Sequence, residues 1–437
     1  MSTTPSIAER LDRLPVTPLH LMAVALCAIG LLLDVAELSV NAALSAVKAG
    51  QGELAWLLAS VFIGGAIGAP LLGWLADRFG RRTALQFSLF VLALPSLGAA
   101  LASDTGWIIF FRMLSGMALG AYPPLMTAYL ADVLPPKRRA MLILFGDGFG
   151  LLGAPAVIFL IWWLTPLVPL GIEGWRWALI LGGVLSCFIS LSFYLVPESP
   201  RWLAARGRIN EANAACRKFE ASAGMVTDGQ SAAVPATANS ELLDRMGRYW
   251  SNLILVTAIY LMRPWPTVAF PSLLGAMLVA RGWNISSSLI AVGIAGFGAA
   301  AGAMLGSFVI DKVERRTALT VVTVLMLIAG AVFGATEDTL VIYVSGTIFN
   351  LLGASYGPML SIYASELFPT ALRARSTATA WAANRLGSAI APLVLLPLLG
   401  QYGLMIVLIS IGATLAVNLA LVLIFGPRGL AGRPLAA

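Results

Sequence analysis

Long apolar runs alternate with short polar segments along the whole chain. Each run has about 18 to 29 residues, and roughly 20 residues of helix cross a bilayer. Twelve runs of this kind lie at 19–47, 54–75, 83–101, 106–130, 141–164, 175–195, 250–278, 287–309, 317–334, 339–363, 376–399 and 404–425. The pattern predicts an all-α polytopic membrane protein with twelve transmembrane helices.

A longer polar stretch divides the predicted spans into two groups of six. It covers 197–249, between a first bundle at 19–196 and a second at 250–425. Residues 1–18 and 426–437 are left as short polar ends. We expect a linker between two six-helix bundles.

The composition agrees with a membrane protein and excludes a soluble enzyme. Hydrophobic residues make up 59% of the chain and charged residues only 11%, whereas a soluble domain has about 25% charged residues. One histidine and three scattered cysteines provide no metal-ligand spacing. No catalytic constellation is present, so we expect no enzyme activity, no cofactor and no metal.

The distribution of basic residues predicts the orientation in the membrane. Of 28 Lys and Arg residues, 22 lie near the two termini or in loops on the same side of the membrane. By the positive-inside rule, both termini should be cytoplasmic in the inner (plasma) membrane. The net charge of +7 then reflects topology and lipid contact, and we expect no nucleic-acid partner. A monomer is expected.

The two halves repeat each other at an offset of 234 residues. DRFGRRTAL at Asp77–Leu85 matches DKVERRTAL at Asp311–Leu319. A second pair has the same offset, because an acid precedes an arginine by seven residues at Asp132–Arg139 and again at Glu366–Arg373. Parallel six-helix repeats of this kind place a substrate near the midplane, between the halves.

Three motifs resemble those of the major facilitator superfamily. They read GWLADRFGRR at Gly73–Arg82, RMLSGMALG at Arg112–Gly120 and PESPRWL at Pro197–Leu203. The third is typical of sugar porters, organic anion and cation transporters, and aromatic acid:proton symporters. The resemblance covers essentially the whole chain and implies a transporter that works by alternating access.

Two details favour the aromatic acid:proton symporters within that superfamily. Their first span carries two acids three residues apart, and Asp34 and Glu37 keep the spacing with Glu in the second place. Their eleventh span carries an Arg followed by Gly and Pro, which NRLGSAIAP at Asn384–Pro392 fits. This resemblance implies proton-coupled uptake of a carboxylate.

Charges inside the first half are candidates for proton coupling, because a charge in a membrane costs about 2.5–3.5 kcal/mol on insertion scales. Asp34 and Glu37 share one face of the first span, and Arg112 lies at a comparable depth in span four. We expect the two acids to bind the driving proton as a coupled pair and Arg112 to tune them. A structural ion pair is the alternative. Asp147 in span five is a weaker candidate for a second proton site, because a buried hydrogen-bonded acid fits it better.

Two arginines of the second half lack an acid at their depth. A guanidinium without a partner suits a carboxylate, which it can bind with two hydrogen bonds. We therefore predict that Arg385 anchors an anionic substrate. Arg263 either assists it, faces the outer vestibule or pairs across the two halves. Further candidates for substrate contact are aromatic or amide side chains at similar depth: Tyr122, Trp265, Asn350, Tyr356, Trp381 and Asn384.

The repeated loop motifs predict a cytoplasmic gate. Acids and bases at helix ends are favoured by the helix dipoles and can hold the two halves together in one state of the cycle. We predict that Asp132–Arg139 and Glu366–Arg373 are paired within this lock. The full set is Gly73, Asp77, Arg81, Asp132, Arg139, Asp311, Arg315, Glu366 and Arg373.

The leading hypothesis is proton-coupled symport of a small organic anion, an aromatic or other carboxylic acid. One alternative is a proton-driven exporter of drugs or organic cations, which should carry an acid where Arg385 stands. Another is a sugar porter, which should have a glutamine-rich lining in span seven, where Arg263, Pro264 and Trp265 stand instead. A transporter-like receptor is a third alternative, and no appended signalling segment supports it.

Overall fold

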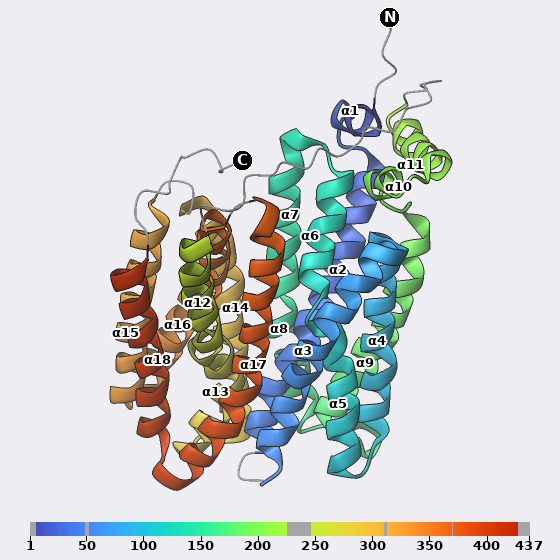
Figure 1. Ribbon diagram of the computed structural model, residues 1–437. Helices are drawn as coiled ribbons and strands as arrows, with labels where there is room; N and C mark the ends of the chain where they lie inside the picture. Colours follow the sequence, from blue (N-terminus) through green and yellow to red (C-terminus); the bar gives the residue numbers. More distant parts are fainter. Residues whose placement is uncertain (1–5, 49–51, 225–245, 310–312, 369, 427–437) are drawn as a thin grey trace, which may run out of the picture.

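The computed structural model describes residues 6–48, 52–224, 246–309, 313–368 and 370–426, and all that follows refers to these. They form two helical bundles side by side, and three short helices lie at one end of the first bundle (Figure 1). Twelve helical segments are long and apolar enough to cross a membrane, and they correspond one to one to the predicted spans. The predicted fold class is confirmed.

The first bundle contains spans one to six, of which spans four and five are each made of two helices. Its helices are α2 (Pro18–Val47), α3 (Leu54–Phe79), α4 (Arg81–Leu101), α5 (Thr105–Leu119) with α6 (Tyr122–Val133), α7 (Pro136–Leu151) with α8 (Gly153–Leu164), and α9 (Gly174–Ser192). Short 3-10 turns lie at Pro169–Gly171 and Phe193–Leu195.

The second bundle contains spans seven to twelve, and span seven is interrupted by a π-helical turn at Trp265–Ala269. Its helices are α12 (Met246–Met262), α13 (Phe270–Ala280), α14 (Ile285–Val309), α15 (Arg315–Ala335), α16 (Thr339–Glu366), α17 (Thr370–Tyr402) and α18 (Leu404–Phe425). Three short helices lie outside the bundles: α1 (Ile7–Asp12), α10 (Pro200–Ala205) and α11 (Ile209–Ser222). We call the end that carries them the linker end, and the opposite end the far end.

The internal repeat is visible in the packing of the helices. A Cβ atom at Gly64 or Gly68 of α3 would collide with backbone carbonyls of α5, and one at Gly298 or Gly302 of α14 would collide with carbonyls of α16. These glycine pairs, and the carbonyls they meet, are each separated by the same 234 residues. Small residues allow helices to approach closely in membranes, so both halves use one packing device.

The two halves meet at the far end. There the Ser45 hydroxyl of α2 accepts a hydrogen bond from the Ala276 amide of α13 (3.2 Å), and Trp162 of α8 donates to Ser286 of α14 (2.8 Å). Gly275 is required in the same contact, because its Cβ would crowd Ala42 and Ala46 of α2. The structure is therefore in a state in which the far end is closed.

Candidate functional site

A buried polar network joins the first and fourth spans. Arg112 is fully buried and donates to the Glu37 carboxylate (2.5 Å) and to the Asn41 side-chain oxygen (2.6 Å). Ser115, one turn along α5, donates to the same Glu37 oxygen (3.2 Å). Asn41 and Ser115 were not singled out in the sequence, although each lies one helical turn from a predicted site residue. The Glu37 carboxylate thus accepts hydrogen bonds from both Arg112 and Ser115.

Asp34 lies outside this network. Its side chain is only 5% exposed, and its Oδ1 atom has no hydrogen-bond partner among the described residues. The charges that act on it are those of Arg385 and Glu37. The two acids that share a face of α2 are thus in different environments: Glu37 is bonded directly to an arginine, whereas Asp34 has a carboxylate oxygen that is unbonded within the described residues.

Arg385 reaches from the second half into the first. Its Nη2 atom donates to the carbonyls of Leu119 (3.2 Å) and Gly120 (3.4 Å), where span four is broken. Its Nε atom is enclosed and has no partner in the described part of the chain. The side chain packs beside Gly65 of α3, so the guanidinium lies at the boundary between the bundles.

Arg263 lies in the same region but makes different contacts. Its guanidinium is 5.7 Å from the ring centre of Tyr260 and 5.5 Å from that of Trp381. Its Nε and Nη1 atoms are enclosed and lack a described partner. Arg385 is 5.9 Å from Trp381 as well, so the structure places both arginines around one indole ring that is 40% exposed.

The other predicted substrate contacts differ in accessibility. Trp265 is half-buried in the π-helical turn, whereas Tyr122, Asn350, Tyr356 and Asn384 are buried. Several of these polar groups are already engaged: the Tyr122 hydroxyl donates to the Cys27 carbonyl (3.3 Å), Asn350 to Gly346 (3.1 Å) and Asn384 to Tyr260 (3.3 Å). In this state the arginines and Trp381 are brought together, whereas Tyr122, Asn350 and Asn384 each bind a backbone carbonyl.

The first-half gate residues connect the linker helices to their own bundle. Asp77 and Arg81 form an ion pair (2.7 Å), and the Asp77 carbonyl accepts hydrogen bonds from Trp202 and Arg206. The Asp132 carboxylate accepts a hydrogen bond from Ser199 (2.8 Å). These contacts explain much of the PESPRWL motif, which attaches α10 to the ends of α3 and α6.

The predicted ion pair between Asp132 and Arg139 is not formed. Arg139 instead donates to the Leu134 carbonyl (3.0 and 3.1 Å), which lies at the end of α6 just before Pro135 and Pro136, and contacts Asp12 of α1 (3.5 Å). A carbonyl left open at a helix end is a strong competitor for a guanidinium.

The structure describes the remaining gate residues only in part. Gly73 has open space around it, and Arg315 donates to the Val313 carbonyl (3.3 Å). Asp311 and the side chains of Glu366 and Arg373 lie outside the described residues.

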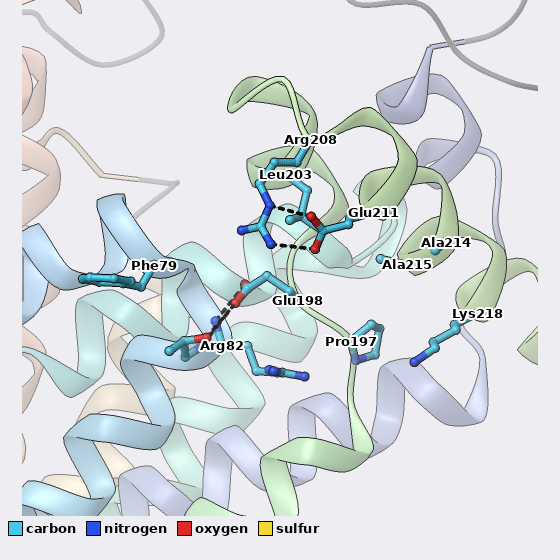
Figure 2. A pocket seen from close by; sticks show the side chains of 11 residues that line it. Phe79, Arg82, Pro197, Glu198, Leu203, Arg208, Glu211, Ala214, Ala215 and Lys218 are labelled. Carbon is cyan, nitrogen blue, oxygen red and sulfur yellow. Dashed lines mark hydrogen bonds and ion pairs between the residues drawn. The ribbon is translucent and has the colours of Figure 1, made fainter.

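A pocket of about 300 Å³ lies at the linker end, between the start of α4 and α11 (Figure 2). Its two acids are both engaged, since Glu198 accepts from the amides of Arg82 (2.9 Å) and Thr83 (3.3 Å), and Glu211 pairs with Arg208 (2.6 Å). Glu198 thereby caps the N-terminus of α4, which is a favourable place for a negative charge. Gly80, with φ of +117°, makes the turn before it, whereas Glu314 at the equivalent position of the second half has φ of −58° and needs no glycine.

The linker helix α11 is held by a buried ion pair. Arg10 of α1 donates to Glu220 (2.8 Å) and to Asn213 (2.7 Å). Cys216 lies in the same interface, where burial raises the pKa of its thiol to about 12. The thiolate is the reactive form of cysteine, so this thiol should be inert while α1 is docked.

Arg10→Ala should expose Cys216 to thiol reagents. In a Cys187→Ser background we expect maleimide labelling at pH 8 to become about tenfold faster or more, because undocking α1 lets the thiol pKa fall toward its ordinary value of about 8.5. Arg208→Ala, which breaks the exposed pair on the same linker, is the matched control and should leave the rate unchanged. Equal labelling of the parent and Arg10→Ala proteins would show that this ion pair does not hold α1 in place.

Comparison with known proteins places these features in context. Residues 28–435 match the family described as "Sugar (and other) transporter". Similar curated proteins include the putative metabolite transport protein YyaJ of Bacillus subtilis (28% identical, covering 96% of this chain and 95% of that protein) and the niacin transporter NiaP of Acinetobacter baylyi (24%, 89% of each). The arabinose-proton symporter of B. subtilis is 29% identical over 75% of this chain and 74% of its own length.

Among solved structures, the inward-open xylose transporter XylE from Escherichia coli has a similar fold. The TM-score is 0.75 at 18% identity, with 95% of this chain and 98% of that chain covered. The match extends over both six-helix halves and therefore concerns the whole architecture.

Proposed function

The chain belongs to the sugar (and other) transporter family of the major facilitator superfamily, and from this premise we propose that it is a proton-coupled symporter of a small polar metabolite. Its family and its structural neighbours are transporters, so it is a multi-pass membrane transporter and not an enzyme. The expected narrower placement among the aromatic acid:proton symporters is not supported, because the matching family is that of the sugar transporters.

The proton site in this proposal is Asp34, and the free Oδ1 atom of that residue is the observation that carries it. A buried carboxyl without a partner can take a proton at little cost, because protonation removes a charge from an apolar environment. Glu37 is already compensated by Arg112 and Ser115, so it has a structural role. The two acids therefore have different roles in this proposal: Asp34 binds the proton, and Glu37 stabilises the structure.

Alternating access supplies the transport step. With the linker end in the cytoplasm, as the positive-inside rule predicts, the closed far end lies on the outer side of the membrane. The hydrogen bonds Ser45–Ala276 and Trp162–Ser286 must break in the opposite state. Two such bonds are few enough for the states to differ by only a few kcal/mol.

A sugar is the first cargo to consider. The arabinose-proton symporter is the relative with the highest identity among those described above, and the xylose transporter shares the fold. Sugars are neutral, so binding one adds no charge to the site that holds Asp34, Arg263 and Arg385. Aromatic rings such as Trp381 can pack against the apolar face of a sugar ring.

A small carboxylate is the second candidate, and the two arginines favour it. Arg263 and Arg385 carry enclosed donor atoms without a described partner, while Asp34 compensates only one of the two charges. An anion bound beside Trp381 would complete the balance. The niacin transporter among the relatives carries a name consistent with such a cargo.

A binding screen separates the two cargo classes. We expect D-xylose or L-arabinose to raise the thermal denaturation temperature of the purified protein, and Trp381→Ala to abolish the rise. Trp163→Ala is the matched control, since that tryptophan is exposed on α8. If only nicotinate or benzoate stabilises the protein, and Arg263→Gln removes that effect, the cargo is a carboxylate; if neither class stabilises it, both assignments are wrong.

A further inference from the structure

Span four is broken where two prolines follow each other. A proline has no N–H group, so the carbonyl four residues earlier loses its helical donor. Pro123 and Pro124 therefore leave the carbonyls of Leu119 and Gly120 open, at the junction between α5 and α6. Open carbonyls in an apolar environment must find another donor.

The donor for both carbonyls comes from the other half of the protein. Nη2 of Arg385 lies 3.2 Å from the Leu119 oxygen and 3.4 Å from the Gly120 oxygen. Helix α17, which carries Arg385, packs against α3 of the first bundle and stands at the junction of the two halves (Figure 1). The two prolines thus create a binding site for an arginine of the opposite bundle. We call the carbonyls of Leu119 and Gly120 the seat of Arg385.

A second proline break is filled in the same way by the neighbouring residue. Pro264 in span seven leaves the Tyr260 carbonyl without its helical donor, and Asn384 donates to that carbonyl (3.3 Å). Gly387 permits this approach, because a Cβ there would collide with the Leu261 carbonyl. Asn384 therefore binds one open carbonyl in its own half, and Arg385 binds two in the other half.

We propose that Asn384 and Arg385 form a strut between the two proline breaks, and that Pro123 and Pro124 position Arg385 for transport. Asn384 fixes α17 to its own half, and Arg385 is seated on the other half. This inference rests on the proposed function, since alternating access requires Arg385 to leave its seat in every cycle. Asp34 is the alternative partner, because its charge acts on Arg385.

The charged groups near Arg385 determine what happens when it leaves the carbonyls of Leu119 and Gly120. Asp34 is faced by Arg385 from α17, by Glu37 on its own helix and by Tyr122 from α6. Arg385 is faced by Asp34 and by Arg263 from span seven. Because Glu37 is held by Arg112, Arg385 is the cation able to move toward Asp34. Its arrival would favour the ionised carboxylate.

Removing the seat should change the pH dependence of transport. In proteoliposomes we expect the Pro123→Ala/Pro124→Ala variant to reach half-maximal uptake at a pH lower by about one unit or more, because Arg385 then pairs with Asp34. Pro95→Ala, which replaces a mid-span proline of α4, is the matched control and should keep the parent profile. An unchanged profile in the double variant would refute the strut.

A second measurement decides the matter without any cargo. Arg385→Gln should lower the thermal denaturation temperature of the parent protein, and should lower it much less when Pro123 and Pro124 are both Ala, because the helix then supplies its own donors. Additive shifts would overturn the inference. This comparison of denaturation temperatures tests the strut even if proton-coupled uptake is not observed. If the double variant does not fold, Pro124→Ala alone can replace it. That variant restores a helical donor only to the Gly120 carbonyl, so Arg385→Gln should then lower the denaturation temperature by an intermediate amount.

Discussion

Asp34→Asn should abolish accumulation of cargo driven by a pH gradient while leaving exchange of cargo intact. A pH difference of one unit supplies about 1.4 kcal/mol per proton, which supports roughly tenfold accumulation for one proton per cargo. Asn cannot take up a proton, so the variant should only equilibrate its cargo. The measurement is uptake into proteoliposomes with and without an imposed gradient, together with counterflow at equal pH.

Glu37→Gln provides the contrast for that experiment. Glu37 is bonded to Arg112 and Ser115, so its replacement should weaken the fold but should keep the pH-driven accumulation of whatever protein folds. The opposite result, with coupling lost in Glu37→Gln and kept in Asp34→Asn, would assign the proton to the other acid.

Arg112→Leu should be the most destabilising single substitution in the site. It leaves Glu37 buried without its counter-ion and the Asn41 side-chain oxygen without its donor, and removing one partner of a buried ion pair costs about 3–5 kcal/mol. Thermal denaturation followed by tryptophan fluorescence should show a large fall in the midpoint. Replacing both partners, as in Glu37→Met/Arg112→Met, should recover much of it, because no uncompensated charge remains.

Arg208→Leu is the control for that stability measurement. Its ion pair with Glu211 is exposed, with side chains 47% and 57% accessible, and exposed pairs contribute little to stability. Similar midpoints for Arg112→Leu and Arg208→Leu would mean that the buried network contributes little to stability.

The twelve spans could be predicted because hydrophobic length is a local property of the chain. The structure extends several of them, such as α3 to Phe79 and α4 from Arg81, since polar residues continue a helix beyond the apolar run into the interface. The repeat was equally predictable, because the glycines that pack α3 and α14 recur at the offset found in the loop motifs.

The partners of the buried charges could be predicted only in part. Depth along the spans placed Arg112 level with the two acids, and the structure pairs it with Glu37. Arg112 could pair with either Asp34 or Glu37 on this argument. The outcome depends on the rotation of α2 against α5, and on the hydrogen bonds of Asn41 and Ser115 that complete the network. Neither can be read from helical spacing alone.

The contacts of Arg385 and Arg139 show a second limit. Charge counting paired Arg139 with Asp132, but Arg139 binds the Leu134 carbonyl. It also did not predict that Arg385 binds the carbonyls of Leu119 and Gly120. Residue identities do not show directly which backbone carbonyls lack a hydrogen-bond donor. Reading each proline as an open carbonyl four residues earlier would have found the seat of Arg385.

Proton movement driven by the cargo tests the central claim most directly. Liposomes that contain the protein and a pH-sensitive dye are given an inward gradient of the cargo found in the binding screen. We predict that the lumen becomes acidic with the parent protein, and that Asp34→Asn admits cargo without a pH change. Cargo entry without acidification in the parent, or acidification that persists in Asp34→Asn, would contradict proton coupling through Asp34.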